Sequence, residues 1–127
     1  MKVLFVCVEN SCRSQIAEGF ARLHGLDAHS AGSKASGKVN ETAVAVMAER
    51  GVDLTTHRSK SLSDVGSAGW DWVVTMGCGD ACPFVPARAK LDWAIPDPKH
   101  LPLPEFRKIR DLIEKKVLEL VDEARDA

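Results

Sequence analysis

The pattern of apolar and polar positions along the chain predicts strands alternating with helices. Residues 2–6 form a near-continuous apolar and β-branched run, which is typical of a strand covered on both faces in a parallel sheet. Residues 72–76 form a second run of this kind, and residues 26–31 and 91–93 are weaker strand candidates. We therefore predict a single doubly wound, three-layer α/β domain over residues 1–127, with a parallel sheet of about four strands flanked by helices.

Apolar residues spaced three and four apart mark the expected helices. The spacing predicts helices over residues 14–24, 40–50 and 106–124, with one further helical turn at 61–65. Gly25 supplies a left-handed stop for the first helix, and Asn40 can cap the second. Residues 83–105 contain all six prolines, so we expect mostly loop there.

Length, charge and cysteine count narrow the class of protein. A chain of 127 residues is the usual size of one domain, and a net charge of -1 with interspersed acids and bases argues against nucleic acid or an anionic membrane as the main partner. The apolar run at residues 3–8 is too short for a signal peptide or a membrane span. We expect a cytoplasmic monomer whose four cysteines start out reduced, which indicates catalysis, redox chemistry or metal binding.

The segment between the first strand and the first helix carries the candidate chemistry. It reads Cys7-Val8-Glu9-Asn10-Ser11-Cys12-Arg13-Ser14, in which five residues separate a cysteine from an arginine. A backbone that turns tightly from a strand into a helix can aim its N–H groups at a tetrahedral oxyanion, and the helix terminus adds partial positive charge. Arg13 offers two parallel donors to such an anion, and the same positive field favours the thiolate of Cys7. We interpret residues 8–13 as an oxyanion-binding loop, with Cys7 as the nucleophile.

Three other residues of this loop have expected roles. Ser14 can donate a hydrogen bond to the Cys7 sulfur and cap the helix, and Asn10 can hold the turn through its side-chain amide. We expect Glu9 to point to solvent, because a carboxylate that faced inward would repel an anion.

Two further thiols, Cys78 and Cys82, follow the second strong strand. Carboxyl ends of parallel strands meet at one edge of a sheet, so we expect these thiols on the same edge as Cys7. A zinc site is disfavoured, because the cysteine spacings are not the usual two-residue knuckles and Arg13 would lie among the ligands. We therefore expect no metal. The four histidines also lack a ligand spacing and are expected at the surface or at helix caps.

The loop closely resembles that of the low-molecular-weight tyrosine phosphatase superfamily. Within that superfamily the chain looks most like the thiol-coupled arsenate reductases. The matching segments are Ser11-Cys12-Arg13-Ser14-Gln15, Ala17-Glu18-Gly19, Ser30-Ala31-Gly32, Val73-Val74-Thr75-Met76, Cys82-Pro83, and Trp93 with Asp97-Pro98.

The resemblance implies a mechanism with three thiols. Cys7 attacks arsenate and Asp97 protonates the leaving hydroxide. Cys78 then attacks the sulfur of the adduct, which releases arsenite, and Cys82 displaces Cys7 to give a Cys78–Cys82 disulfide. An external thiol donor such as thioredoxin opens that disulfide, no cofactor is bound, and phosphate or sulfate compete as oxyanions. The spacing of three residues between Cys78 and Cys82 is shorter than the family often has, so the order of the thiol steps stays open.

The alternative is a tyrosine phosphatase that acts through a phosphocysteine at Cys7. Phosphatases of this superfamily tend to carry an aromatic residue after the Asp-Pro acid, whereas Lys99 and His100 follow here. Arsenate reduction is therefore the favoured function.

Some members of the superfamily bind potassium beside the loop through residues that match Asn10, Glu18 and Ser33. Arg58 and Lys60 occupy the remaining positions of that site here. Two cationic side chains do not suit a cation site, so we expect Lys60 to pair with Glu18 in place of the ion.

Overall fold

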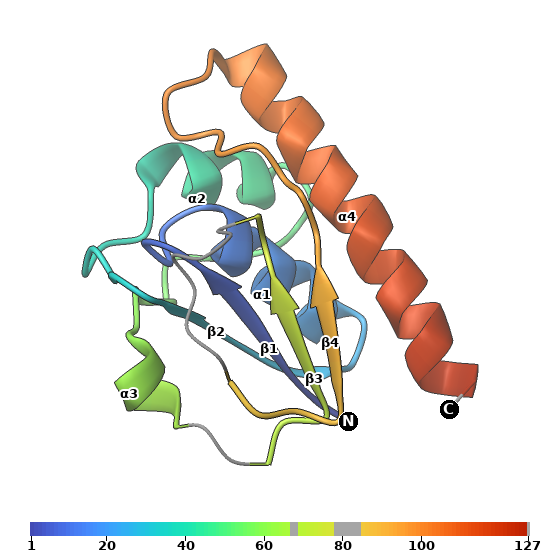
Figure 1. Cartoon of the computed structure of the whole chain (residues 1–127). Helices are drawn as coiled ribbons and strands as arrows, with labels where there is room; N and C mark the ends of the chain where they lie inside the picture. Colours follow the sequence, from blue (N-terminus) through green and yellow to red (C-terminus); the bar gives the residue numbers. More distant parts are fainter. Residues whose placement is uncertain (67–68, 78–84, 127) are drawn as a thin grey trace.

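A four-stranded parallel sheet forms the centre of the molecule (Figure 1). The computed structural model describes residues 1–66, 69–77 and 85–126. The strands pair in the order β2-β1-β3-β4, and every pair is parallel. Their bounds are β1 (Lys2–Cys7), β2 (Asp27–Gly32), β3 (Trp72–Thr75) and β4 (Ala89–Asp92). The predicted parallel sheet is confirmed, and β4 begins two residues before the predicted strand.

Helices cover the sheet at the places that the apolar spacing predicts. Their bounds are α1 (Arg13–Leu23), α2 (Glu41–Ala48), α3 (Leu62–Val65) and α4 (Leu103–Asp126). Asn40 caps α2 as predicted, because its side chain accepts hydrogen bonds from two backbone N–H groups of the first turn. Helix α4 begins before the first residue of its apolar pattern, since Pro104 is tolerated in a first helical turn.

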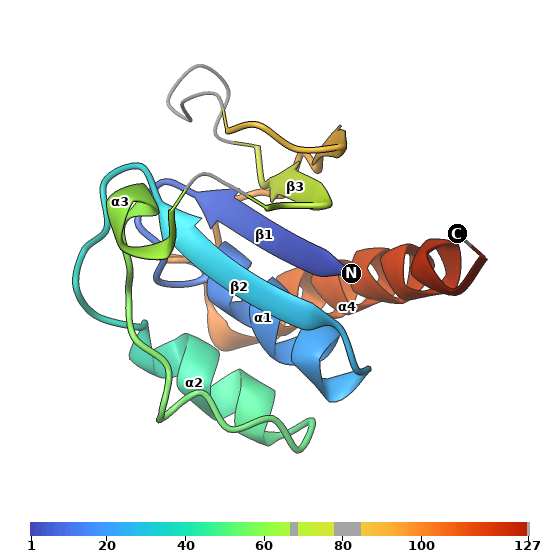
Figure 2. The same cartoon turned by 90° about the horizontal axis from the view of Figure 1, so that it is seen from below.

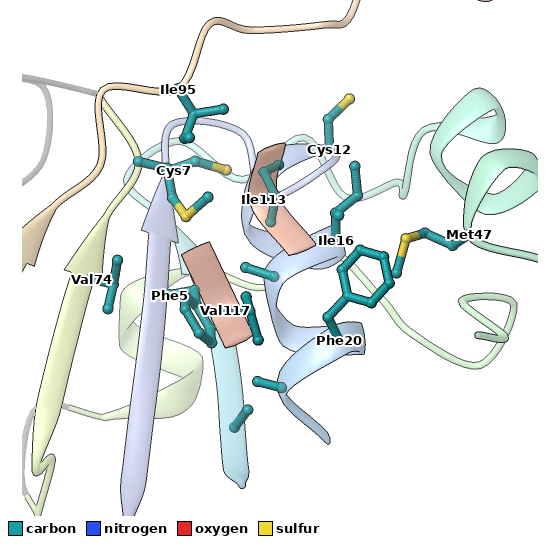
Figure 3. Packing of buried hydrophobic residues seen from close by; sticks show 14 of the residues in the cluster. Phe5, Cys7, Cys12, Ile16, Phe20, Met47, Val74, Ile95, Ile113 and Val117 are labelled. Atoms are coloured by element: carbon teal, nitrogen blue, oxygen red, sulfur yellow. The ribbon is translucent and has the colours of Figure 1, made fainter. Parts of the chain in front are cut away.

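The apolar residues of β1 pack on both faces of the sheet. Phe5 joins the larger cluster with residues of α1, α2 and α4, such as Phe20, Met47 and Val117 (Figure 3). Figure 2 shows these three helices on one side of β1 and β2. Leu4 and the next alternate residue, Val6, lie on the opposite face with Trp70, Val73 and Val85, next to Leu62 and Val65 of α3. Burial on both faces explains the uninterrupted apolar run and gives the predicted three layers.

The order of the strands places a crevice at the carboxyl end of β1. The chain passes from β1 through α1 to β2 on one side, and then crosses to β3 on the other side of β1. Ligands of open α/β sheets bind at such a switch point. Gly32 ends β2 directly beneath the loop that follows β1, where an added Cβ would lie 2.5 Å from the Val8 carbonyl oxygen. Of the helices in the described ranges, none combines the length and apolarity that crossing a membrane requires.

Candidate active site

The backbone carbonyls of the loop are tied to the segment that follows β2. The carbonyls of Cys7, Val8 and Glu9 accept hydrogen bonds of 2.8–3.2 Å from the N–H groups of residues 33, 34 and 36, respectively, and that of Ser11 accepts one of 3.0 Å from Asn40. The amide groups of residues 9–13 donate to no protein acceptor within the described ranges. A loop whose carbonyls are held elsewhere keeps its amides available for an anion.

Asn10 fixes the turn as predicted. Its backbone is left-handed, with φ of 52°, which asparagine tolerates better than most residues. The side-chain oxygen accepts from the Lys60 N–H at 2.7 Å and from Gln15 Nε2 at 2.9 Å. The side-chain nitrogen must therefore face the other way, and it donates to Ser14 Oγ at 2.8 Å.

Ser14 donates to the candidate nucleophile. Cys7 Sγ lies 2.8 Å from Ser14 Oγ, which also accepts from Asn10. Because a thiolate can only accept, the Ser14 hydroxyl is the donor whenever Cys7 is ionised. A hydrogen bond to a thiolate stabilises the charged form. The predicted capping role of Ser14 is wrong. Helix α1 starts at Arg13 with Cys12 at the N-cap position, and no side chain caps it, because Ser14 lies inside the first turn.

Arg13 joins the loop to the far side of the crevice. Its Nη1 donates to the carbonyls of Met76 at 2.7 Å and Ile95 at 3.2 Å, so it contacts the end of β3 and the chain that follows β4. Nη2 lies 3.9 Å from Asp97 Oδ2. The guanidinium is nearly buried and fixed in direction, which suits a group that orients an oxyanion.

The predicted nucleophile, arginine and acid line one small cavity. Cys7, Glu9, Ser11, Cys12, Arg13 and Asp97 surround a volume of about 10 Å³, roughly one water-sized sphere. Asp97 is half-exposed at the mouth, where a carboxylic acid has access to a leaving group above the sulfur. The Glu9 side chain is one-third exposed, which agrees with the prediction that it points to solvent, although its charge has a partner that the sequence did not reveal. Glu9 lines the cavity, and Lys99 compensates its charge at 2.8 Å.

The second thiol of the loop is not a competing nucleophile. Cys12 is buried, and burial raises the pKa of its thiol to about 11, against a smaller opposing effect of the Ser11 hydroxyl. Cys12 therefore remains protonated at neutral pH and packs with the core cluster (Figure 3).

Comparison with known proteins assigns the family. The family model described as low molecular weight phosphotyrosine protein phosphatase matches residues 2–126. The chain belongs to this family. The resemblance stated from the loop and its flanking motifs is thereby confirmed.

Within the family, the chain is similar to arsenate reductases. A glutaredoxin arsenate reductase from Synechocystis is 36% identical over 126 residues, which cover 94% of this chain and 95% of that protein. A solved arsenate reductase in the phosphate binding state has a TM-score of 0.87 at 35% identity and covers 96% of this chain and 97% of the other. A thioredoxin-dependent arsenate reductase from Corynebacterium glutamicum has a TM-score of 0.77 at 32% identity, covering 98% of this chain and 61% of the other.

A buried carboxylate lies behind the loop in this member of the phosphatase family. The Glu18 side chain is only 2% exposed, and the Ser30 hydroxyl donates to it. Arg22 Nη2 lies 2.9 Å from one of its oxygens, and Lys60 Nζ lies 3.6 Å from the other. The predicted Lys60–Glu18 pair is confirmed. Two cations already compensate the carboxylate, so these residues do not fit the potassium site of other family members.

Gln15 and His57 extend the hydrogen-bond network, and sequence reasoning missed both. Gln15 is fully buried, and its Nε2 also donates to the Arg58 carbonyl at 2.8 Å. Its Oε1 therefore faces His57 Nδ1 at 3.0 Å, which requires that this nitrogen carry a proton. Burial lowers the pKa of His57 despite the opposing charge of Glu18. The prediction of a surface or capping role is wrong for His57, whose side chain is 11% exposed.

Cys78 and Cys82 lie outside the described residues. The described chain reaches Gly77, whose φ of 82° is left-handed, immediately after the Met76 carbonyl that Arg13 holds. Gly77 thus lies at the carboxyl end of β3, and because β3 is parallel to β1, this is the end of the sheet that carries Cys7. In the described ranges, no three His, Cys, Asp or Glu side chains are grouped as metal ligands are.

Proposed function

We propose that this chain reduces arsenate to arsenite at Cys7, as part of arsenic detoxification. The observation that carries the proposal is the convergence of Cys7, Arg13 and Asp97 on one cavity at the switch point of the sheet. Arg13 and the free amides of the loop hold the oxyanion, and the Ser14 proton stabilises the thiolate. Cys7 then displaces hydroxide from arsenic(V), and Asp97 supplies the proton that makes the leaving group water.

The reduction itself is a thiol relay that uses Cys78 and Cys82. The Cys78 thiolate attacks the Cys7 sulfur of the arsenic adduct, and the sulfur–arsenic bonding pair stays with arsenic as arsenite leaves. The two electrons that reduce arsenic come from these two thiolates, which become a disulfide. Cys82 then attacks Cys78, which forms the second disulfide and frees Cys7.

An external thiol donor completes the cycle, and we assign this role to a thioredoxin. Similarity to one arsenate reductase named for glutaredoxin and another named for thioredoxin supports an external protein thiol. Reduced thiols at rest fit a cytoplasmic protein. We further propose that residues 1–127 act as a single domain and a monomer.

Phosphotyrosine hydrolysis is the rival function, because the family model carries that name. It needs the same loop and the same acid, and a phosphocysteine at Cys7 would be hydrolysed by water. It has no need of Cys78 and Cys82. Lys99 follows Asp97-Pro98 and its ammonium pairs with Glu9, whereas an aromatic ring after the acid would favour a phosphotyrosine.

The decisive experiment maps disulfides by mass after one equivalent of arsenate is added to the reduced protein. We expect a Cys78–Cys82 disulfide in the native chain and a trapped Cys7–Cys78 disulfide in Cys82→Ser. With thioredoxin, its reductase and NADPH, arsenate should drive NADPH oxidation, and Cys7→Ser, Cys78→Ser or Cys82→Ser should each stop it. Phosphate in place of arsenate is the matched control. Rapid aryl phosphate hydrolysis without arsenate-dependent oxidation would support the phosphatase instead.

A further inference from the structure

An ion pair links the oxyanion loop to the segment that carries the candidate acid. Lys99 Nζ lies 2.8 and 3.0 Å from the two carboxylate oxygens of Glu9, although the two residues are 90 positions apart in the sequence. The side chains of Glu9 and Lys99 are 34% and 37% exposed, so the pair lies at the surface of the site. The backbone N–H of Lys99 donates to Asp97 Oδ1 at 3.1 Å, so the same residue also contacts the acid.

This pair lies at the boundary between two cavities of very different size. Glu9 and Ser11 line the cavity of about 10 Å³ over Cys7. Lys99 and Ser11 line a neighbouring cavity of about 390 Å³, together with Ser36, Lys38, Asn40, Glu41 and Thr42. Any group attached to the oxyanion would therefore have to displace the Glu9–Lys99 pair in order to reach the larger space.

The pair also settles an electrostatic conflict within the loop. Glu9 is one of the residues around a cavity that is to receive an anion, and its carboxylate would repel that anion if its charge were not compensated. The Lys99 ammonium compensates this charge through two contacts, and the interaction with Glu9 raises the pKa of Lys99. Removal of Lys99 alone would leave the repulsion in place.

We propose that the Glu9–Lys99 pair determines substrate specificity by closing the oxyanion cavity to all but free inorganic oxyanions. The pair blocks the way from the small cavity into the larger one, so the organic group of a phosphate or arsenate ester cannot occupy the larger cavity. The compensated charge keeps the small cavity favourable for an anion. This inference builds on the proposed function, because it names the substrate class of the same site.

The test measures oxyanion binding without turnover. Iodoacetamide alkylates Cys7, and peptide mass mapping reports the alkylation rate with increasing inorganic phosphate or phenyl phosphate as protecting ligand. In the native chain we expect phosphate to protect at least tenfold better than phenyl phosphate. In Lys99→Ala this preference should fall at least fivefold, because the two cavities become continuous. Lys99→Arg, which keeps a cation for Glu9, is the matched control and should retain the native preference.

A charge cycle separates the two parts of the proposal. Lys99→Ala should weaken phosphate protection about threefold to tenfold, and Glu9→Gln in the same chain should restore it while the ester is still admitted. The proposal is overturned if Lys99→Ala discriminates between the two ligands as the native chain does, with its thermal midpoint unchanged. Arsenate-dependent disulfide formation is scored separately. If the native chain forms no arsenate-dependent disulfide but the variants show the predicted selectivity, the proposed reduction is refuted and the specificity role of the Glu9–Lys99 pair is supported.

Discussion

The ammonium group of Lys60 compensates a buried carboxylate, and its removal should lower the stability of the protein by a measurable amount. Lys60→Met keeps the length of the side chain and removes the charge. At the observed 3.6 Å from Glu18, two unit charges interact by about 5 kcal/mol with an effective dielectric constant of about 20. Loss of one partner from a buried ion pair costs about 3–5 kcal/mol when the remaining charge is left alone.

The expected loss is smaller because Glu18 keeps other partners. Arg22 remains 2.9 Å from the carboxylate, and the Ser30 hydroxyl still donates to it. The Lys60 side chain is also 16% exposed, which weakens the interaction. We therefore expect Lys60→Met to lower the free energy of unfolding by about 1–3 kcal/mol. For a domain of this size, this corresponds to a fall in Tm of roughly 3–12 °C.

Urea denaturation in potassium chloride and in choline chloride, at equal ionic strength, measures both the loss and its cause. If Lys60 takes the place of an ion, potassium should recover part of the stability of Lys60→Met and leave the native chain unchanged. Lys60→Arg is the control, because it retains a cation beside Glu18. A Lys60→Met protein as stable as the native chain would refute the reasoning. If the stability lost in Lys60→Met is the same in potassium and in choline, Lys60 compensates the charge of Glu18 but does not take the place of a bound potassium ion.

Three further predictions concern the loop and its support. Ser14→Ala removes the hydrogen-bond donor to the Cys7 thiolate. Hydrogen bonds to charged groups contribute about 1.5–3 kcal/mol, so alkylation of Cys7 at pH 6.5 should slow about tenfold or more. An unchanged rate would contradict the hydrogen bond from Ser14 to Cys7. Gly32→Ala places a methyl group 2.5 Å from a loop carbonyl oxygen, so phosphate should no longer protect Cys7 and stability should fall by about 1–3 kcal/mol; native protection would show that the loop can move. Burial holds the pKa of His57 below its ordinary value of 6.5, so the unfolded chain takes up a proton first and the free energy of unfolding should decrease as pH falls below about 6.5. Urea titrations at pH 7.5 and 5.5 should show this decrease in the native chain and in His100→Gln, but a smaller one in His57→Gln.

Local patterns along the chain were sufficient to predict the centre of the fold. The run at residues 2–6 and the Cys7 to Arg13 spacing are properties of one short segment, so strand, loop and helix could be placed together. The start of β4 could not be predicted in the same way. Lys90 interrupts any apolar pattern at this edge of the sheet, and the strand there is defined by backbone pairing with β3.

The contacts missed from the sequence join distant segments. Gln15 and His57 are 42 residues apart, and Glu9 and Lys99 are 90 apart, so no spacing rule connects them. Glu9 was expected in solvent because an inward-facing carboxylate would repel an anion, and nothing in the loop itself indicates that Lys99 would be its partner. The Lys60–Glu18 pair was predictable because the family resemblance had already assigned the two positions to one site.

The two carbonyl contacts of Arg13 change how its variants should be interpreted. One nitrogen of the guanidinium is committed to Met76 and Ile95, so the side chain ties the oxyanion loop to the two loops that follow β3 and β4, on the far side of the crevice, even before a ligand arrives. A shorter or singly donating replacement would release both loops and also lose the anion. Loss of activity in such a variant therefore reflects both the loss of oxyanion binding and the loss of the contacts that hold the site together. The protease resistance of residues 93–97 reports the second effect and should be measured alongside the activity.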